Sequence, residues 1–269
     1  MAVIVLKILL SAGMVIVITL TAERVSARLA GVMAGFPLGT GLTLFFLGLE
    51  QGPVFAADSA LWSIQGILAT LGFCWCYRMT AVRLSSNSRR VSLACSCLAG
   101  LAGYFVTAAT ITMMPANAVL RTCVVLLLLP PPAIAFRKSA PEKIREKAAV
   151  IWSMLMVRAV FASLVILTVT GLAAFVGPAW AGLLAAFPTV ILPSVMILHF
   201  NYGGGSVPSF FRDTPLAMPA IIVFSLSVHW TFPHLGLIGG TILSYGAALV
   251  YLAVYERRLR AIFDRLLPS

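Results

Sequence analysis

Residues 148–175 read AAVIWSMLMVRAVFASLVILTVTGLAAF, an apolar run with one charged side chain, Arg158. A helix needs about 20 apolar residues to cross the hydrocarbon core of a bilayer, and this run is longer than that. Backbone N–H and C=O groups in lipid must find their partners inside the segment, so such a run forms a helix and not an open strand. The stretch therefore predicts a membrane-spanning α-helix.

Comparable runs fill most of the chain. Hydrophobic residues make up 61% of the sequence and charged residues only 10%, whereas soluble domains carry about 25% charged residues. The predicted spans are residues 2–22, 29–49, 58–77, 91–112, 117–136, 148–175, 179–200, 215–232 and 236–255. We therefore expect an all-α polytopic membrane protein of about nine transmembrane helices, several of them broken by proline, with no room for a soluble domain.

Lysine and arginine residues indicate the orientation of the spans. Basic connections alternate with connections that lack both residues, and cytoplasmic loops are the ones enriched in them. The predicted cytoplasmic segments contain Arg24, Arg28, Arg78, Arg83, Arg89, Arg90, Arg137, Lys138, Lys143, Arg145, Lys147, Arg212, Arg257, Arg258, Arg260 and Arg265. We expect a multi-pass protein of the bacterial inner membrane, with the N-terminus outside and the C-terminus in the cytoplasm. The net charge of +11 then reflects topology and contacts with anionic lipids, and no nucleic-acid partner is expected.

Two stretches of the sequence match each other. Residues 30–37 read AGVMAGFP and residues 181–188 read AGLLAAFP, and the same offset pairs Gly52 with Gly203. The first span is predicted to run inward and its counterpart outward, so the copies would be inverted repeats, as in many secondary transporters. The predicted parts are a first repeat of four helices (1–112), a linker helix with a basic loop (113–147), a second, inverted repeat (148–255) and a basic tail (256–269).

Short motifs in both copies add to this interpretation. In the first copy they are Lys7, Ala30-Gly31, Phe36-Pro37, Glu50-x-Gly52 and Trp62-Ser63-Ile64, and in the second Ala181-Gly182, Phe187-Pro188-Thr189 and His199. Each copy thereby resembles the small GlpM-type inner-membrane proteins, which are about one repeat long. The resemblance covers spans one to four and six to nine, and it implies a fused inverted tandem of two four-helix units. The second copy departs from the pattern at Asn201, which replaces the acidic residue. The family's biochemical role is poorly defined, so the resemblance implies an architecture more than an activity.

The candidate binding residues are two Phe-Pro pairs and two cations inside spans. If the helices break at Phe36-Pro37 and Phe187-Pro188, two helix N-termini approach the midplane, and their N–H groups and positive dipole ends favour an anion. The alternative is a pair of proline kinks that serve packing. Lys7 and Arg158 are paired by the repeat, and no acidic residue is expected at comparable depth. A central anion would compensate both charges, whereas the alternative is that the two side chains extend to the membrane surface.

Other polar residues offer weaker signals. Glu50, His199 and Asn201 are candidates for a coupling role, with exposed or packing positions as the alternative. Cys74-x-Cys76 and Cys95-x-Cys97 are not expected to bind metal, because residues i and i+2 of a helix point apart. No metal site and no cofactor are predicted.

The function expected from these features is secondary transport or export of a small anionic or carboxylate-bearing solute, with its site at the pseudo-twofold midplane. One alternative is an anion channel with the same pseudo-symmetric architecture. Another is a structural or assembly factor for an envelope pathway. An enzyme is not expected, because the spans contain no carboxylate pair and no His/Asp cluster. The expected partners are the lipid bilayer, the solute and, as one assembly, a second copy of the chain in a homodimer.

Overall fold

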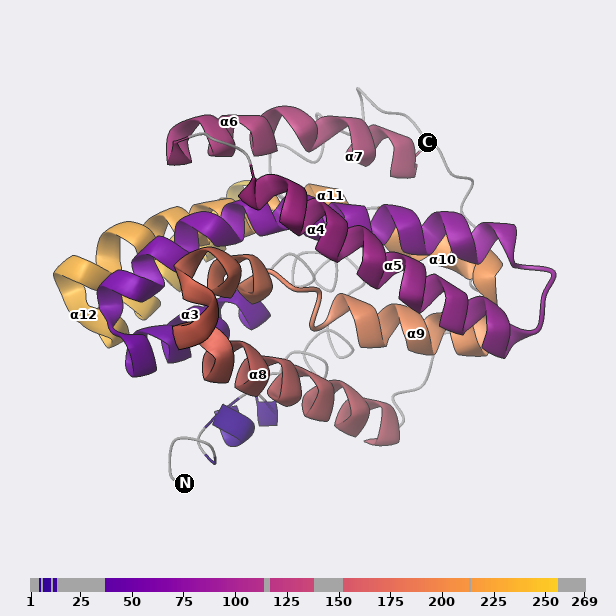
Figure 1. The fold of residues 1–269 in the computed structure, drawn as a ribbon, viewed down its shortest axis with the longest axis horizontal. Coiled ribbons are helices and arrows are strands. Elements are labelled where there is room, and N and C mark those ends of the chain that lie inside the picture. Colours follow the sequence, from indigo (N-terminus) through magenta and orange to yellow (C-terminus); the bar gives the residue numbers. More distant parts are fainter. Residues whose placement is uncertain are drawn as a thin grey trace.

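The computed structural model describes residues 5, 7–10, 12–13, 37–113, 117–137, 152–212 and 214–255. Throughout these ranges the ordered elements are helices, and no strand occurs among them (Figure 1). The predicted first span lies largely outside the described residues, as do the start of the second span, the basic loop 138–147 and the tail 256–269.

The main helices are α3 (Leu38–Gln51), α4 (Pro53–Arg83), α5 (Arg89–Thr112), α6 (Ala118–Leu128), α7 (Pro130–Arg137), α8 (Trp152–Ala185), α9 (Ile191–Tyr202) and α12 (Pro219–Val254). Three short elements, η1 (Gly204–Ser206), α10 (Val207–Phe211) and α11 (Thr214–Ala217), connect α9 to α12. In the described part of the chain, five helices are long and apolar enough to cross a membrane, namely α4, α5, α6 with α7, α8 and α12. This composition indicates a membrane-embedded helical protein.

Glycines with positive φ mark places where the chain reverses. In α12, Gly236 (φ 69°, ψ 178°) interrupts the helix. The hydroxyl of Thr231, before this glycine, lies 3.2 Å from that of Ser244, after it, although thirteen residues of straight helix would separate them by about 20 Å. Therefore α12 is two antiparallel helices, which agrees with the predicted span boundary between 232 and 236. Gly177 (φ 73°, ψ 174°) interrupts α8 in the same way, between the predicted spans 148–175 and 179–200.

Helix α4 forms the centre of the bundle. It packs against α3, α5, α6, α8 and α12, and Figure 1 shows it running along the length of the molecule between them. Small residues permit the close approach of these helices, as at Gly182, where an added Cβ would lie 2.7 Å from the Cβ of Trp62. A buried hydrogen bond of 2.8 Å between the Ser63 and Ser225 hydroxyls joins α4 to α12. Because α4 contacts all of these helices, a residue's neighbours on α4 show how far along the bundle that residue lies.

Candidate functional site

Two short helices begin near the middle of α4 and run to its opposite ends. Near the end of α3, an added Cβ on Gly48 would lie 3.4 Å from the Cβ of Ala56 in the first turns of α4. The last turn of α9 contacts the other end of α4, since His199 Nδ1 lies 3.2 Å from the hydroxyl of Tyr77. Between them, Thr70 at the middle of α4 donates a 2.8 Å hydrogen bond to the carbonyl of Ala186, just before α9. The N-termini of α3 and α9 therefore approach each other halfway along the bundle.

The break between α8 and α9 is a real interruption of the helix. Helix α8 ends at Ala185 and α9 begins at Ile191, with Pro188 between them, so a break and not a simple kink holds at Pro188. Pro37 directly precedes α3, and the residues before it, including Phe36, lie outside the described part of the chain. The nearness of the two segments shows at Gly39, where an added Cβ would collide with the Thr189 hydroxyl.

At the break, side chains of neighbouring helices donate hydrogen bonds to backbone carbonyl groups. Tyr104 of α5 donates a 2.7 Å hydrogen bond to the carbonyl of Leu183, and Thr70 does the same for Ala186. The ring of Tyr104 also packs edge-to-face against Phe187, with 5.0 Å between the ring centroids. Irregular backbone at membrane depth is tolerated where protein groups satisfy it or where it lines a cavity, and both conditions hold here.

A cavity of about 80 Å³ lies between the two helix starts. Its walls are formed by the first turn of α3, the break before α9, the middle of α4 and the α11–α12 region: Pro37, Leu38, Gly39, Thr40, Ile67, Thr70, Ala186, Phe187, Pro188, Thr189, Val190, Ile191, Thr214, Met218 and Ile221. A space of this size holds several water molecules or one small solute.

The cavity is uncharged and mostly apolar, with side-chain polar groups contributed by threonines. Four threonines, Thr40, Thr70, Thr189 and Thr214, are among its lining residues, and none of the described lining residues carries a charge. The first N–H groups of a helix have no intrahelical acceptor, so the starts of α3 and α9 add N–H donors and the positive ends of two helix dipoles. Hydroxyl groups, N–H donors and positive dipole ends together favour a small anion or the anionic end of a polar solute.

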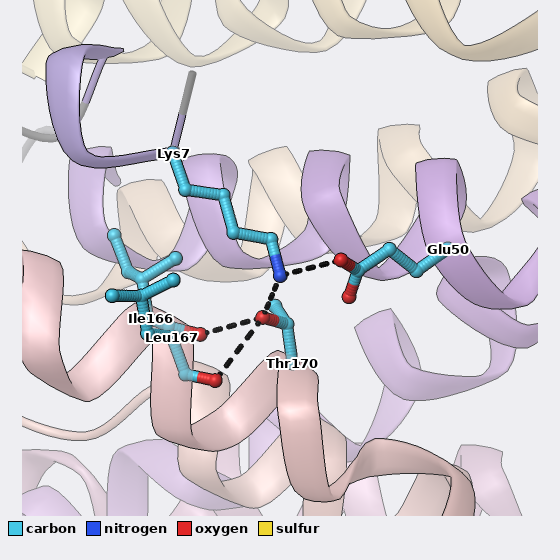
Figure 2. Close-up of polar contacts among 5 residues, drawn as sticks. All are labelled: Lys7, Glu50, Ile166, Leu167 and Thr170. Carbon is cyan, nitrogen blue, oxygen red and sulfur yellow. Dashed lines mark hydrogen bonds and ion pairs between the residues drawn. The ribbon is translucent and has the colours of Figure 1, made fainter. Parts of the chain in front are cut away.

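Lys7 lies apart from this cavity and has an acidic partner (Figure 2). Its ammonium is 2.7 Å from Glu50 Oε1, donates a hydrogen bond to the Thr170 hydroxyl of α8, and lies 5.7 Å from the centroid of the Phe46 ring. The expectation that Lys7 has no acidic residue at its depth is therefore wrong. Glu50 was interpreted as a loop residue, but it belongs to the last turn of α3 and reaches Lys7 from there.

The backbone positions of Arg158 and of the Lys7 contact lie at different levels of α8. Lys7 contacts Thr170, which lies twelve residues after Arg158 on the same helix, α8. Twelve residues of α-helix correspond to about 18 Å, and the side chain of Arg158 lies outside the described part of the structure. The predicted central site that receives both cations therefore stays a prediction.

At the opposite end of the bundle, His199 is fully buried. Its Nε2 lies 3.0 Å from the Ser92 hydroxyl of α5, and its Nδ1 faces Tyr77, so both ring nitrogens have hydroxyl partners. Arg89 donates a 3.3 Å hydrogen bond to the backbone carbonyl of Asn201. Therefore His199 and Asn201 join α9 to the α4–α5 turn, away from the cavity and from Glu50.

Searches of protein-family models, of curated proteins and of solved structures find no match to this chain.

The sequence interpretation missed the threonines. Thr40 and Thr189 are almost completely buried at the cavity, and Thr170 receives Lys7. Threonine usually bonds to a carbonyl of its own helix, as Thr170 does to Ile166 at 2.8 Å, so a threonine in a span carries little signal. One clue was available, since Thr189 directly follows Phe187-Pro188 and Thr40 lies three residues after Pro37.

Proposed function

We propose that this chain is a secondary transporter or exporter of a small anionic or carboxylate-bearing solute, and that the cavity between α3 and α9 binds the solute. One observation carries the proposal: two helices begin at the middle of the bundle around an uncharged cavity whose walls include four threonines. Discontinuous helices whose N-termini face a central site are how many secondary transporters bind anionic groups. The cavity lies halfway along a bundle whose long helices suit a membrane.

Inverted repeats are part of the same proposal. Helices α3 and α9 each end at a glycine of nearly the same backbone conformation, Gly52 (φ 95°, ψ 158°) and Gly203 (φ 86°, ψ 173°). These two glycines are paired by the offset of the internal sequence match. The two helices also run from the cavity toward opposite ends of α4, as a twofold axis in the membrane plane requires. These features support a fused, inverted tandem of GlpM-like units, with the N-terminus outside and the C-terminus in the cytoplasm of a bacterial inner membrane.

Basic side chains support that orientation. Arg89 contacts the end of α9, and Arg83 and Arg90 flank the same α4–α5 turn. Figure 1 places this turn and the end of α7, which carries Arg137, toward the same end of the bundle. A concentration of arginine at one end is typical of the cytoplasmic side.

Flux measurements in proteoliposomes test the proposal. The protein should move one or more small anions from a panel of carboxylates, phosphate and halides, with saturation. Thr189→Val and Thr40→Val should each reduce the apparent affinity about 10-fold or more, because a hydrogen bond to a charged group contributes about 1.5–3 kcal/mol. Thr110→Val is the matched control, because Thr110 is exposed on α5 and bonds only to Val106 of its own helix.

The outcomes separate the candidate functions. Saturable flux that the two cavity variants weaken and Thr110→Val does not weaken supports a transporter. Unsaturated current with the same mutational pattern would instead indicate an anion channel. If wild-type protein moves none of the anions, the transport proposal fails, and a structural role in the envelope becomes the better account.

A further inference from the structure

We propose that Lys7 forms a second, outer binding station for the carboxylate of the solute, and that Glu50 acts as its internal competitor. The Glu50 carboxylate occupies the station when no solute is bound and moves aside when a solute carboxylate replaces it. This inference rests on the proposed function, because it takes the transported solute to be a carboxylate.

The surroundings of Lys7 require a negative partner. The residue is only 3% exposed, and a buried ammonium is stable only when a counter-charge and hydrogen bonds compensate its desolvation. Thr170 already donates its hydroxyl proton to Ile166, so it offers Lys7 a lone pair and no charge. In the described structure the compensating charge comes from the carboxylate of Glu50.

Glu50 is the member of the pair that can be exchanged. Its side chain is 29% exposed, whereas that of Lys7 is 4% exposed. It also lies in the last turn of α3, immediately before the reversal at Gly52, where the negative end of the helix dipole disfavours a carboxylate. Rotation of the Glu50 side chain would free the ammonium while Lys7, Thr170 and the backbone stay in place (Figure 2).

Helix α3 connects this station to the cavity. Glu50 lies in its last turn, and Leu38, which lines the cavity, is its first residue. Their separation of twelve positions along the helix corresponds to about 18 Å. At the position that the internal match pairs with Glu50 stands Asn201, whose amide has no charge. In the part of the chain that the structure describes, Glu50 therefore supplies a competitor at one end and the paired position supplies an uncharged amide, which would give the two ends different affinities for the solute.

Equilibrium binding of acetate to the purified full chain in nanodiscs tests this inference, with acetamide as the uncharged probe. Glu50→Gln should bind acetate about 10-fold more tightly than wild type, because it removes a competitor whose local concentration is millimolar or higher. In the Lys7→Gln/Glu50→Gln double variant the gain should disappear. Asp58→Asn is the matched control, because it removes an exposed carboxylate from the first turns of α4 and should leave acetate binding unchanged.

Glu50→Asp provides a second variant if Glu50→Gln does not fold, since its shorter side chain should weaken competition and give an intermediate gain. The inference is overturned if neither Glu50 variant binds acetate more tightly, or if the gain survives in the double variant. Flux distinguishes this failure from failure of the proposed function. Flux that depends on Thr189 with no binding gain in the Glu50 variants would refute the station alone, whereas a binding gain without any flux would refute transport alone.

Discussion

Gly182→Ala should destabilise the protein by about 3 kcal/mol, a large effect for one methyl group. A Cβ at this position would collide with the carbonyl oxygen of Ser59 and lie 2.7 Å from the Cβ of Trp62. Because the first obstacle is backbone, α4 and the second part of α8 would have to move apart, and overpacking of this kind costs about 1–3 kcal/mol or more. Thermal unfolding and size-exclusion chromatography in detergent measure the effect.

Gly171→Ala is the control for this prediction. Gly171 lies on the same helix, and an added Cβ there would meet no heavy atom within 4 Å. Because alanine favours a helix by about 0.5–1 kcal/mol relative to glycine, this variant should be as stable as wild type or slightly more stable. Equal stability of the two variants would contradict the close contact between α8 and α4.

Glu50→Gln should lower the free energy of unfolding more than Lys7→Met does. The Glu50 variant leaves a nearly fully buried ammonium without a counter-charge, whereas the Lys7 variant leaves a carboxylate that water can reach. Breaking a buried ion pair costs about 3–5 kcal/mol when a buried charge remains, so we expect about 3 kcal/mol for Glu50→Gln and about 1 kcal/mol for Lys7→Met. The double variant Lys7→Met/Glu50→Gln should lie close to wild type.

Thermal melts of the four proteins in the same detergent provide the double-mutant cycle. Additive losses in the double variant would show that Lys7 and Glu50 do not interact. A larger loss for Lys7→Met than for Glu50→Gln would show that Glu50, and not Lys7, is the buried member of the pair.

The all-helical, membrane-embedded character of the chain could be predicted from the sequence because it depends on local properties. Apolar length predicts a helix in lipid, and glycine marks reversals because it alone adopts positive φ freely. The sequence indicated Pro188 as the place of a break or a kink, and the structure has a break there. The ends of α3 at Gly52 and of α9 at Gly203 lie a few residues beyond the predicted span ends at 49 and 200. The backbone itself marks two of the predicted boundaries, since Gly177 and Gly236 leave the helical conformation where two predicted spans meet.

The partner of Lys7 could not be predicted, because it depends on tertiary packing. Glu50 follows a long apolar run and precedes Gly52-Pro53, which is the pattern of a residue at the edge of a loop. Its carboxylate reaches Lys7 only because α3, α8 and the N-terminal segment pack together. The same limit applies to the cavity: the sequence indicated Pro37 and Pro188, but not that Thr70 of α4 would lie beside them.

The central claim is that the cavity between α3 and α9 is the path of the solute, and thiol accessibility tests it most directly. Thr189→Cys would be introduced after replacement of the five native cysteines, with Ala108→Cys, a fully buried position on α5 outside the cavity, as the control. Membrane-impermeant thiol reagents should label Thr189→Cys from each side of the membrane in turn, a transported anion should slow the reaction, and Ala108→Cys should stay unlabelled. If Thr189→Cys reacts from neither side, or equally well with and without every anion that the protein transports, the cavity is not the path.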